Sequence, residues 1–231
     1  MSPNPPGQFD QAPDRAEIVQ APDGAEIVWF SSGPTGRAIT PAPAVILVHG
    51  ITENAASWLP VAERLAITNQ VIRMDLRGHG QSSMTPPYDL ATMAGDVASV
   101  ISDAELVRPP HVIGHSLGGA VVSALGGSGL AHSVVSVDQS LRLAGFKDQL
   151  SQVEAHLRSV EAFPKVMAGM FEAMYGPALA AGERQRLDEL RRADQAVVLG
   201  VWELLFTMGE AEINQVIDDA LAPYAQSQTP Y

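Results

Sequence analysis

Ser116 is the residue of this 231-residue chain whose surroundings are best suited to covalent chemistry. It lies in the run Gly114-His115-Ser116-Leu117-Gly118, between a short apolar stretch and a helix-forming stretch. A strand that turns directly into a helix at such a run holds the serine in a strained backbone conformation and exposes its hydroxyl. The free N–H groups at the start of the helix point at the same place, where they can stabilise an anion. The pattern therefore predicts that Ser116 is a nucleophile.

The segments around Ser116 alternate between predicted strands and helices. Apolar runs and helical spacing predict strands over 44–48, 71–74, 111–115 and 133–137, and helices over 57–66 and from Asp89 onward. Regular alternation of this kind implies an α/β fold with a doubly wound, mostly parallel sheet, whose sites lie at the carboxyl ends of the strands. His49-Gly50-Ile51, Ser116 and Asp138 all follow such ends, so we expect them to converge.

The run around Ser116, set between a strand and a helix, resembles the nucleophile elbow of the α/β-hydrolase family. The resemblance implies an oxyanion hole made of two backbone N–H groups, that of Leu117 and that of Ile51 in the loop after the His-Gly strand. It also implies an acid that orients the base. Asp138 is our candidate, because it ends a strand just after the nucleophile's helix. In other members the acid follows the next strand, and Asp138 would then cap a helix or bind neighbouring N–H groups.

The base that the resemblance implies is a histidine that follows the acid in the sequence. The six histidines of the chain are His49, His79, His111, His115, His132 and His156. None has the expected position after the last strand of the family core, and His115 should point away from its neighbour Ser116. We therefore expect the sequence to be truncated before the last strands and the catalytic histidine. A natural chain without activity and a site completed by another subunit are the alternatives.

Composition and patterning divide the chain into four segments. Residues 1–14 are rich in Pro, Gln and Asn and predict a disordered lead-in. Residues 15–143 are assigned to the α/β-hydrolase core. Residues 144–222 show helical patterning, which the resemblance identifies as an inserted helical cap, and 223–231 are assigned to the start of the return to the core. The C-terminal part of the core is expected to be missing.

The core begins with a near-repeat of nine residues. The copies are QAPDRAEIV from Gln11 and QAPDGAEIV from Gln20, and only the second contains the turn pair Asp23-Gly24. Two copies are too few for a solenoid. The turn pair lies between two half-alternating runs, so we expect a β-hairpin.

The predicted cap carries an apolar stripe, which consists of Phe163, Val166, Met167, Met170, Phe171 and Met174. Flexible Met and Phe side chains can line a pocket that adapts to apolar acyl groups. Residues that simply pack the cap onto the sheet would have the same spacing. We favour this second interpretation of the stripe.

The chain has a formal net charge of −12 and no cysteine. Nucleic acid and anionic membranes bind basic surfaces, so this charge argues against both as partners. The absence of cysteine excludes disulfides and thiolate sites. The first residues lack the basic and apolar regions of a signal peptide, and no run approaches the roughly 20 apolar residues of a membrane span. We therefore expect a cytoplasmic protein.

Together these patterns predict a serine hydrolase that cleaves a small apolar ester or a related acyl bond, without a metal or an organic cofactor, and that is active only in a longer chain that supplies the histidine. Ser116 would attack the carbonyl, Ile51 and Leu117 would stabilise the oxyanion, and water would release an acyl-enzyme. The rival interpretation is a noncatalytic α/β-hydrolase-like protein that keeps the apolar cleft under the cap as a ligand pocket. The sequence leaves the substrate and the oligomeric state open.

Overall fold

The computed structural model describes residues 15–34, 42–225 and 229–231. The strands are β1 (Arg15–Gln20), β2 (Glu26–Ser32), β3 (Val45–Val48), β4 (Val71–Met74), β5 (His111–His115) and β6 (Ser133–Val137). The α-helices are α1 (Leu59–Leu65), α2 (Leu90–Asp103), α3 (Leu117–Leu125), α4 (Ala144–Leu157), α5 (Phe163–Met174), α6 (Ala181–Leu190), α7 (Gln195–Thr207) and α8 (Glu210–Leu221). The disorder expected for residues 1–14, and residues 226–228 of the expected return segment, lie outside the described residues.

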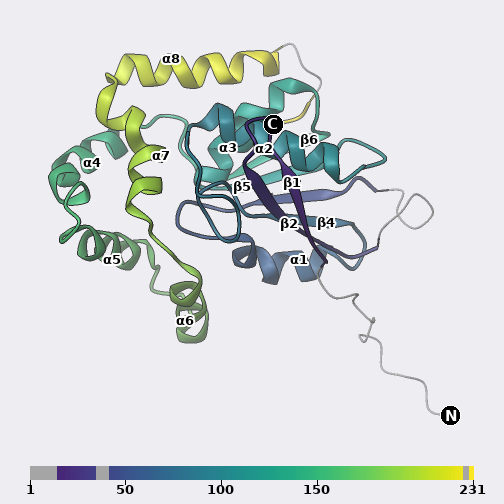
Figure 1. Cartoon of the computed structure of the whole chain (residues 1–231), viewed down its shortest axis with the longest axis horizontal. Coiled ribbons are helices and arrows are strands. Elements are labelled where there is room, and N and C mark those ends of the chain that lie inside the picture. The colour runs from purple at the N-terminus through teal and green to yellow at the C-terminus, as the bar shows by residue number, and fades with distance from the viewer. Residues whose placement is uncertain (1–14, 35–41, 226–228) are drawn as a thin grey trace.

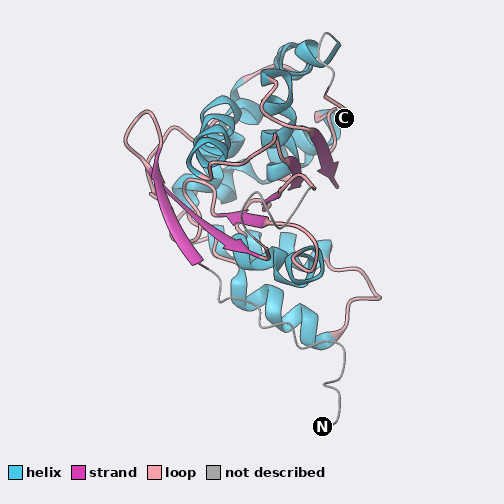
Figure 2. Cartoon of the chain, turned by 90° about the vertical axis from the view of Figure 1, so that its right-hand side faces the viewer, coloured by secondary structure: helices cyan, strands magenta, loops and turns pink. Residues whose placement is uncertain are grey.

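The strands form one sheet in the order β1-β2-β4-β3-β5-β6, with helices on both sides (Figure 1, Figure 2). β3 pairs in parallel with β4 and β5, and β5 pairs in parallel with β6. β1 and β2 extend the sheet in antiparallel pairings beyond β4. Every residue of β3 and of β4 is buried, as strands covered on both faces require. The predicted α/β fold with a mostly parallel sheet is confirmed.

Alternate residues of β3 face opposite sides of the sheet. Ile46 and Val48 belong to the largest apolar cluster, which includes side chains of α2 and α3. Val45 and Leu47 belong to a smaller cluster with Ala62 of α1. The strand that precedes the His49-Gly50 turn is therefore fixed from both faces, and so is the direction in which the following loop leaves the sheet.

The part of the near-repeat from Arg15 onward forms the predicted hairpin, since β1 pairs with β2 from Gln20 opposite Glu26 onward. Gly24 in the turn has a φ of 86°, a backbone conformation that side chains disfavour. The neighbouring Asp23 accepts a 2.8 Å hydrogen bond from Arg77 Nη1, and the buried Arg77 Nε donates at 2.6 Å to Asp96. The hairpin is thus tied by charge to the loop after β4 and to α2.

Helices α4 to α8 form a group to one side of the sheet, with α8 running back toward it (Figure 1). The group has its own apolar cluster, whose buried members are Leu150, Leu157, Phe163, Met167, Val198, Trp202, Leu205, Ile213 and Ile217. Met167 of the predicted stripe is buried in this cluster, whereas Met174 is 58% exposed. The stripe thus packs these helices against one another rather than onto the sheet. α7 joins the group to the sheet, because its Val197 is buried in the cluster of α2 and α3.

Within the described parts of the chain, no helix combines the length and the apolar character needed to cross a bilayer.

Candidate active site

Ser116 connects β5 directly to α3, with φ 49° and ψ −120°. A positive φ is strained for serine, and it persists here because the surrounding backbone fixes it. The Ser116 N–H donates a 2.9 Å hydrogen bond to the Val137 carbonyl at the end of β6. A Cβ on Gly114 would overlap the Gly118 carbonyl, and a Cβ on Gly118 would overlap the Val48 carbonyl. The two glycines are therefore what allows the strand and the helix to meet at so sharp a turn.

The His49-Gly50-Ile51 loop lies beside this turn, as the sequence predicts. A Cβ on Gly50 would be 3.3 Å from Ser116 Cβ. The Ile51 side chain packs against both the sheet cluster and the cluster of the helical group, so it lies where the two meet. Among the described residues, neither the Ile51 N–H nor the Leu117 N–H donates a hydrogen bond. Both predicted oxyanion donors thus remain available next to Ser116.

His49 holds this loop and does not act on Ser116. Its ring is fully buried, Nε2 accepts a 3.0 Å hydrogen bond from the Leu76 N–H, and Nδ1 donates to the Gly50 carbonyl at 2.7 Å. Burial, with a smaller contribution from His79, lowers the pKa of His49 to about 3. The neutral ring therefore acts as a fixed link between the ends of β3 and β4.

Two residues that the sequence did not single out, Glu53 and Arg191, also lie at this site. Glu53 Oε2 accepts the Gly50 N–H at 3.1 Å and lies 3.4 Å from His115 Nδ1. Arg191 Nη2 lies 4.0 Å from Glu53 Oε1. No sequence signal identifies them, because Glu53 is a loop residue of ordinary type and Arg191 reaches it across 138 positions of the chain.

The Glu53–His115 pair shifts the pKa of both groups. The hydrogen bond to Glu53 raises the pKa of His115, against the opposing effect of burial, and the charge of Asp138 adds to the rise. Burial would raise the pKa of Glu53, but the contacts with His115 and with the Gly50 N–H bring it below its usual value. The sequence predicts only that His115 points away from Ser116. The structure adds that the partner of its ring is Glu53.

Asp138, the candidate acid, follows β6 at the same edge of the sheet. It has a φ of 52° and its side chain is exposed. Among the described residues, Asp138 forms no hydrogen bond with a histidine, nor does any histidine form one with the Ser116 hydroxyl. The structure thus brings Ser116, Ile51, Leu117 and Asp138 to one edge, but it joins none of the six histidines to them as a base.

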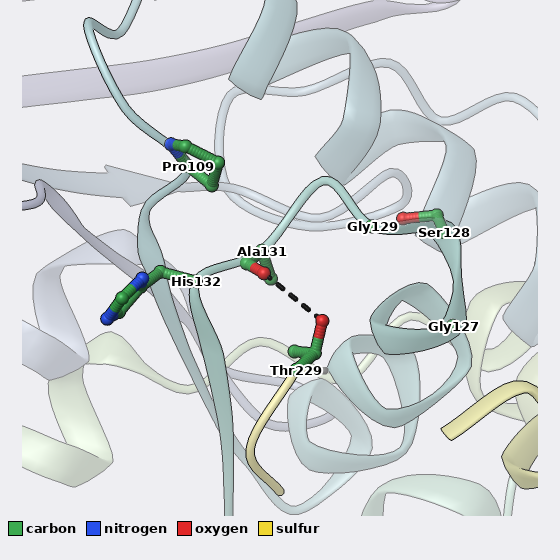
Figure 3. Close-up of a pocket in the computed structure, with 7 residues that line it drawn as sticks. All are labelled: Pro109, Gly127, Ser128, Gly129, Ala131, His132 and Thr229. Carbon is green, nitrogen blue, oxygen red and sulfur yellow. Dashed lines mark hydrogen bonds between the residues drawn. The ribbon is translucent and has the colours of Figure 1, made fainter. Parts of the chain in front are cut away.

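The cavity shown in Figure 3 lies away from this site. It has a volume of about 420 Å³ and is lined by Pro109, Gly127, Ser128, Gly129, Ala131, His132 and Thr229. Pro109 and His132 precede β5 and β6, so the cavity is at the amino ends of the strands whose carboxyl ends carry the site. In the described ranges, no group of three or more His, Asp and Glu side chains is arranged to hold a metal ion.

Known proteins resemble this chain in sequence and in fold. The sequence profile described as "Alpha/beta hydrolase family" matches residues 45–231. Protein phosphatase methylesterase 1 of Homo sapiens is 29% identical over 143 residues, which cover 59% of this chain and 36% of that protein. The match thus spans little more than a third of that relative's length.

Solved structures of other proteins resemble this chain over a larger part of its length. A hydrolase from Pseudomonas aeruginosa PA01 has a TM-score of 0.59 at 26% identity, with 90% of this chain and 72% of that chain covered. A thermophilic esterase from Thermogutta terrifontis has a TM-score of 0.69 at 18% identity, with 94% and 89% covered. At 18% identity, the second likeness concerns the fold alone.

Proposed function

This chain belongs to the alpha/beta hydrolase family, and from that premise we propose that it hydrolyses a small ester through Ser116. The observation that carries the proposal is the backbone of Ser116, which is held at a positive φ directly between β5 and α3. Strain of this kind at a turn from a strand into a helix is the arrangement that exposes a nucleophilic hydroxyl. The name of one relative in sequence, a methylesterase, supports an ester as the substrate class.

In the proposed reaction, Ser116 Oγ attacks the ester carbonyl as its proton passes to a base. The N–H groups of Ile51 and Leu117 then bind the oxyanion of the tetrahedral intermediate, which collapses to an acyl-enzyme and an alcohol. Water attacks the acyl-enzyme and releases the acid. We retain Asp138 as the residue that orients the base. The base would be a histidine that follows the acid in the sequence, because the triad that the resemblance implies has the order serine, acid and then histidine.

The apolar surroundings support a small, uncharged acyl group. Ile51 lies between the sheet cluster and the cluster of the helical group, so an acyl chain bound to Ser116 would face apolar side chains from both. Apolar groups gain binding free energy of about 25 cal/mol for each Å² removed from water. We propose an ester with a short apolar acyl group as the substrate.

Covalent labelling with a fluorophosphonate tests the proposal. The reagent reacts with serines activated as nucleophiles, so the full-length wild-type protein should gain one adduct at Ser116 and its Ser116→Ala variant none. Ser151→Ala is the matched control, because Ser151 is an exposed serine on α4; its labelling should equal that of the wild type. Hydrolysis of p-nitrophenyl butyrate should follow the same pattern. Wild-type protein without an adduct at Ser116 would refute the proposal.

A noncatalytic ligand-binding protein is the second candidate. It is favoured by one observation: among the described residues, no histidine forms a hydrogen bond with the Ser116 hydroxyl. This candidate predicts binding of apolar esters by calorimetry in both wild type and Ser116→Ala, without hydrolysis or labelling in either.

A further inference from the structure

Glu53 is a buried carboxylate beside Ser116 that the proposed reaction does not use. Only 9% of its side chain is exposed, although it belongs to a loop. Its two oxygens face three groups, namely the Gly50 N–H at 3.1 Å, His115 Nδ1 at 3.4 Å and Arg191 Nη2 at 4.0 Å. A buried carboxylate is stable only with such partners. Glu53 therefore links the loop after β3, the end of β5 and the segment between α6 and α7.

The contact with Gly50 matters because the next residue is Ile51, a proposed oxyanion donor. A Cβ on Gly50 would lie 3.4 Å from Glu53 Oε2 and 3.3 Å from Ser116 Cβ, so these groups surround one point. The Glu53 N–H also donates to the Gly50 carbonyl at 3.2 Å. Residues 50–53 thus form a closed turn, and displacement of the carboxylate would displace the peptide that carries the Ile51 N–H.

Arg191 keeps its position through contacts other than Glu53. Its guanidinium lies 4.6 Å from the ring centroid of Phe171 and 5.1 Å from that of Tyr175. The N–H of the next residue, Arg192, donates a 2.8 Å hydrogen bond to the Thr52 carbonyl. A cation fixed in this way gives the Glu53 carboxylate a constant orientation.

We propose that Glu53 is a positioning residue, whose carboxylate holds residues 50–53 against His115 and Arg191 and thereby sets the Ile51 N–H for oxyanion binding at Ser116. The inference rests on the proposed function, because it concerns the oxyanion hole of that same reaction. Hydrogen-bond donors lower a barrier most when they need no reorganisation as the charge forms. Glu53 acts through the Gly50–Ile51 peptide and does not itself touch the substrate.

Amide hydrogen exchange tests the positioning without any need for catalysis. The Gly50 amide should exchange about ten to a hundred times faster in Glu53→Ala than in wild type, the fold-change expected when a hydrogen bond to a charged group is lost. Glu53→Gln keeps a carbonyl acceptor and should give an intermediate rate. Glu63→Gln, an exposed change on α1, is the matched control and should leave exchange unaltered.

Kinetics test the consequence for the reaction. In Glu53→Ala, kcat for an ester and the fluorophosphonate labelling rate of Ser116 should fall about a hundredfold, the usual effect of losing one oxyanion donor. KM should stay within about twofold, since the donor acts in the transition state. Glu53→Gln should recover about a tenth of the wild-type kcat or more, because it restores the acceptor for Gly50 without the charge.

The outcomes separate the inference from the proposed function. Wild-type labelling of Ser116 together with unchanged exchange and kcat in Glu53→Ala would overturn the inference alone. A wild type without an adduct at Ser116 would overturn the proposed function, and unchanged Gly50 exchange in Glu53→Ala would then still refute the role of Glu53 in holding the loop. If Glu53→Ala does not fold, the nearly isosteric Glu53→Gln supplies both comparisons, and wild-type values for it would refute the proposal.

Discussion

Two loops flank Ser116, and the structure holds them in different ways. The loop over 49–57, after β3, is mostly buried, and its backbone is bound by side chains from elsewhere in the chain: Asp75 Oδ1 accepts the Ala55 N–H at 2.7 Å. The loop over 138–143, after β6, is half-buried to exposed, and its hydrogen bonds are largely local, as between Ser140 and Arg142. The half of the site that is proposed to bind an oxyanion is thus set in advance, while the candidate acid Asp138 on the other half is held by few contacts.

The difference indicates how the chemistry is divided between the loops. Donors for an oxyanion must be in position before charge develops, and the buried loop satisfies that condition. An acid that orients a base needs the base as its partner, and Asp138 forms no hydrogen bond with a histidine in the described part of the chain. Its role stays a prediction. Matched substitutions at the two loops, compared by their effects on stability and on activity, test this contrast.

The largest effect is expected from Gly118→Ala, where a Cβ would overlap the backbone carbonyls of Val48 and His49 at the start of the held loop. We expect the free energy of unfolding to fall by about 4 kcal/mol, or folding to fail. Gly145→Ala in α4, just after the other loop, meets no atom within 4 Å. It should change stability by less than about 1 kcal/mol. Urea unfolding measures both, and equal losses would contradict the contrast.

A smaller loss is expected from Asp75→Ala. The buried carboxylate accepts the N–H groups of Ala55 at 2.7 Å and Gln81 at 2.9 Å, and the variant leaves both donors without an acceptor. Unfolding free energy should decrease by about 3 kcal/mol. Asp148→Ala, on the exposed face of α4, serves as the control. Similar melting temperatures for the two variants would show that Asp75 does not hold the loop.

The stability of the held loop should also depend on pH through His49. Its folded pKa of about 3 lies below its ordinary value of 6.5, so the unfolded chain takes up this proton first and acid favours unfolding. Between pH 7 and pH 5 this amounts to about 2 kcal/mol. The nearby charged or titratable groups are His79, Glu53 and His115. Urea unfolding at pH 7, 6 and 5 should show that His49→Gln loses this pH dependence. If the unfolding free energy of the variant changes with pH as much as that of the wild type, His49 is not its source.

His115 should make stability depend on pH in the opposite direction from His49. Its pKa is raised, so the stability that it contributes is present below pH 6.5 and is lost as the pH rises through the folded pKa. The groups that face it are Glu53, Asp138, Arg191 and His49. The two histidines can be distinguished by their NMR titrations, in which His49 should stay neutral well below the pH at which His115 becomes charged.

The smallest effect on stability is expected from Asp138→Asn. The side chain is exposed in the weakly held loop, so unfolding free energy should change by less than about 0.5 kcal/mol. As the proposed acid, the residue should nevertheless matter for hydrolysis, and we expect kcat to fall about a hundredfold or more. Wild-type kcat in this variant would exclude Asp138 as the acid, whereas a large loss of stability would contradict the description of its loop.

The sequence predicts the parts of the site that depend on short stretches of chain. The positive φ of Ser116 follows from two flanking glycines and a strand-to-helix transition within a few residues. The convergence of Ile51, Leu117 and Asp138 follows because parallel strands present their carboxyl ends at one edge. The expectation about truncation is not tested by the structure.

The remaining features depend on contacts between distant residues. The pairing of Glu53 with His115 spans 62 positions, and no local pattern indicates it. The insertion of β4 between β2 and β3 in the sheet likewise depends on how the whole sheet assembles. The helical spacing around Met167 predicts packing onto the sheet, but the stripe packs within the helical group instead, because helical spacing specifies which residues are buried and not what covers them.

The hydrogen bonds between the held loop and the helical group bear on protein engineering. Arg192 N–H binds the Thr52 carbonyl, Asn54 Nδ2 binds the Leu190 carbonyl at 3.1 Å, and Arg186 Nη1 binds the Ala56 carbonyl at 3.2 Å. A chimera that received its helices from a homologue to change its substrate range would lose the Arg186 bond with that side chain, and it would keep the other two only where the grafted backbone lies in the same place. Grafts that retain residues 186–192 should therefore keep their kcat, whereas grafts that replace this segment should change the substrate range at the cost of a lower kcat.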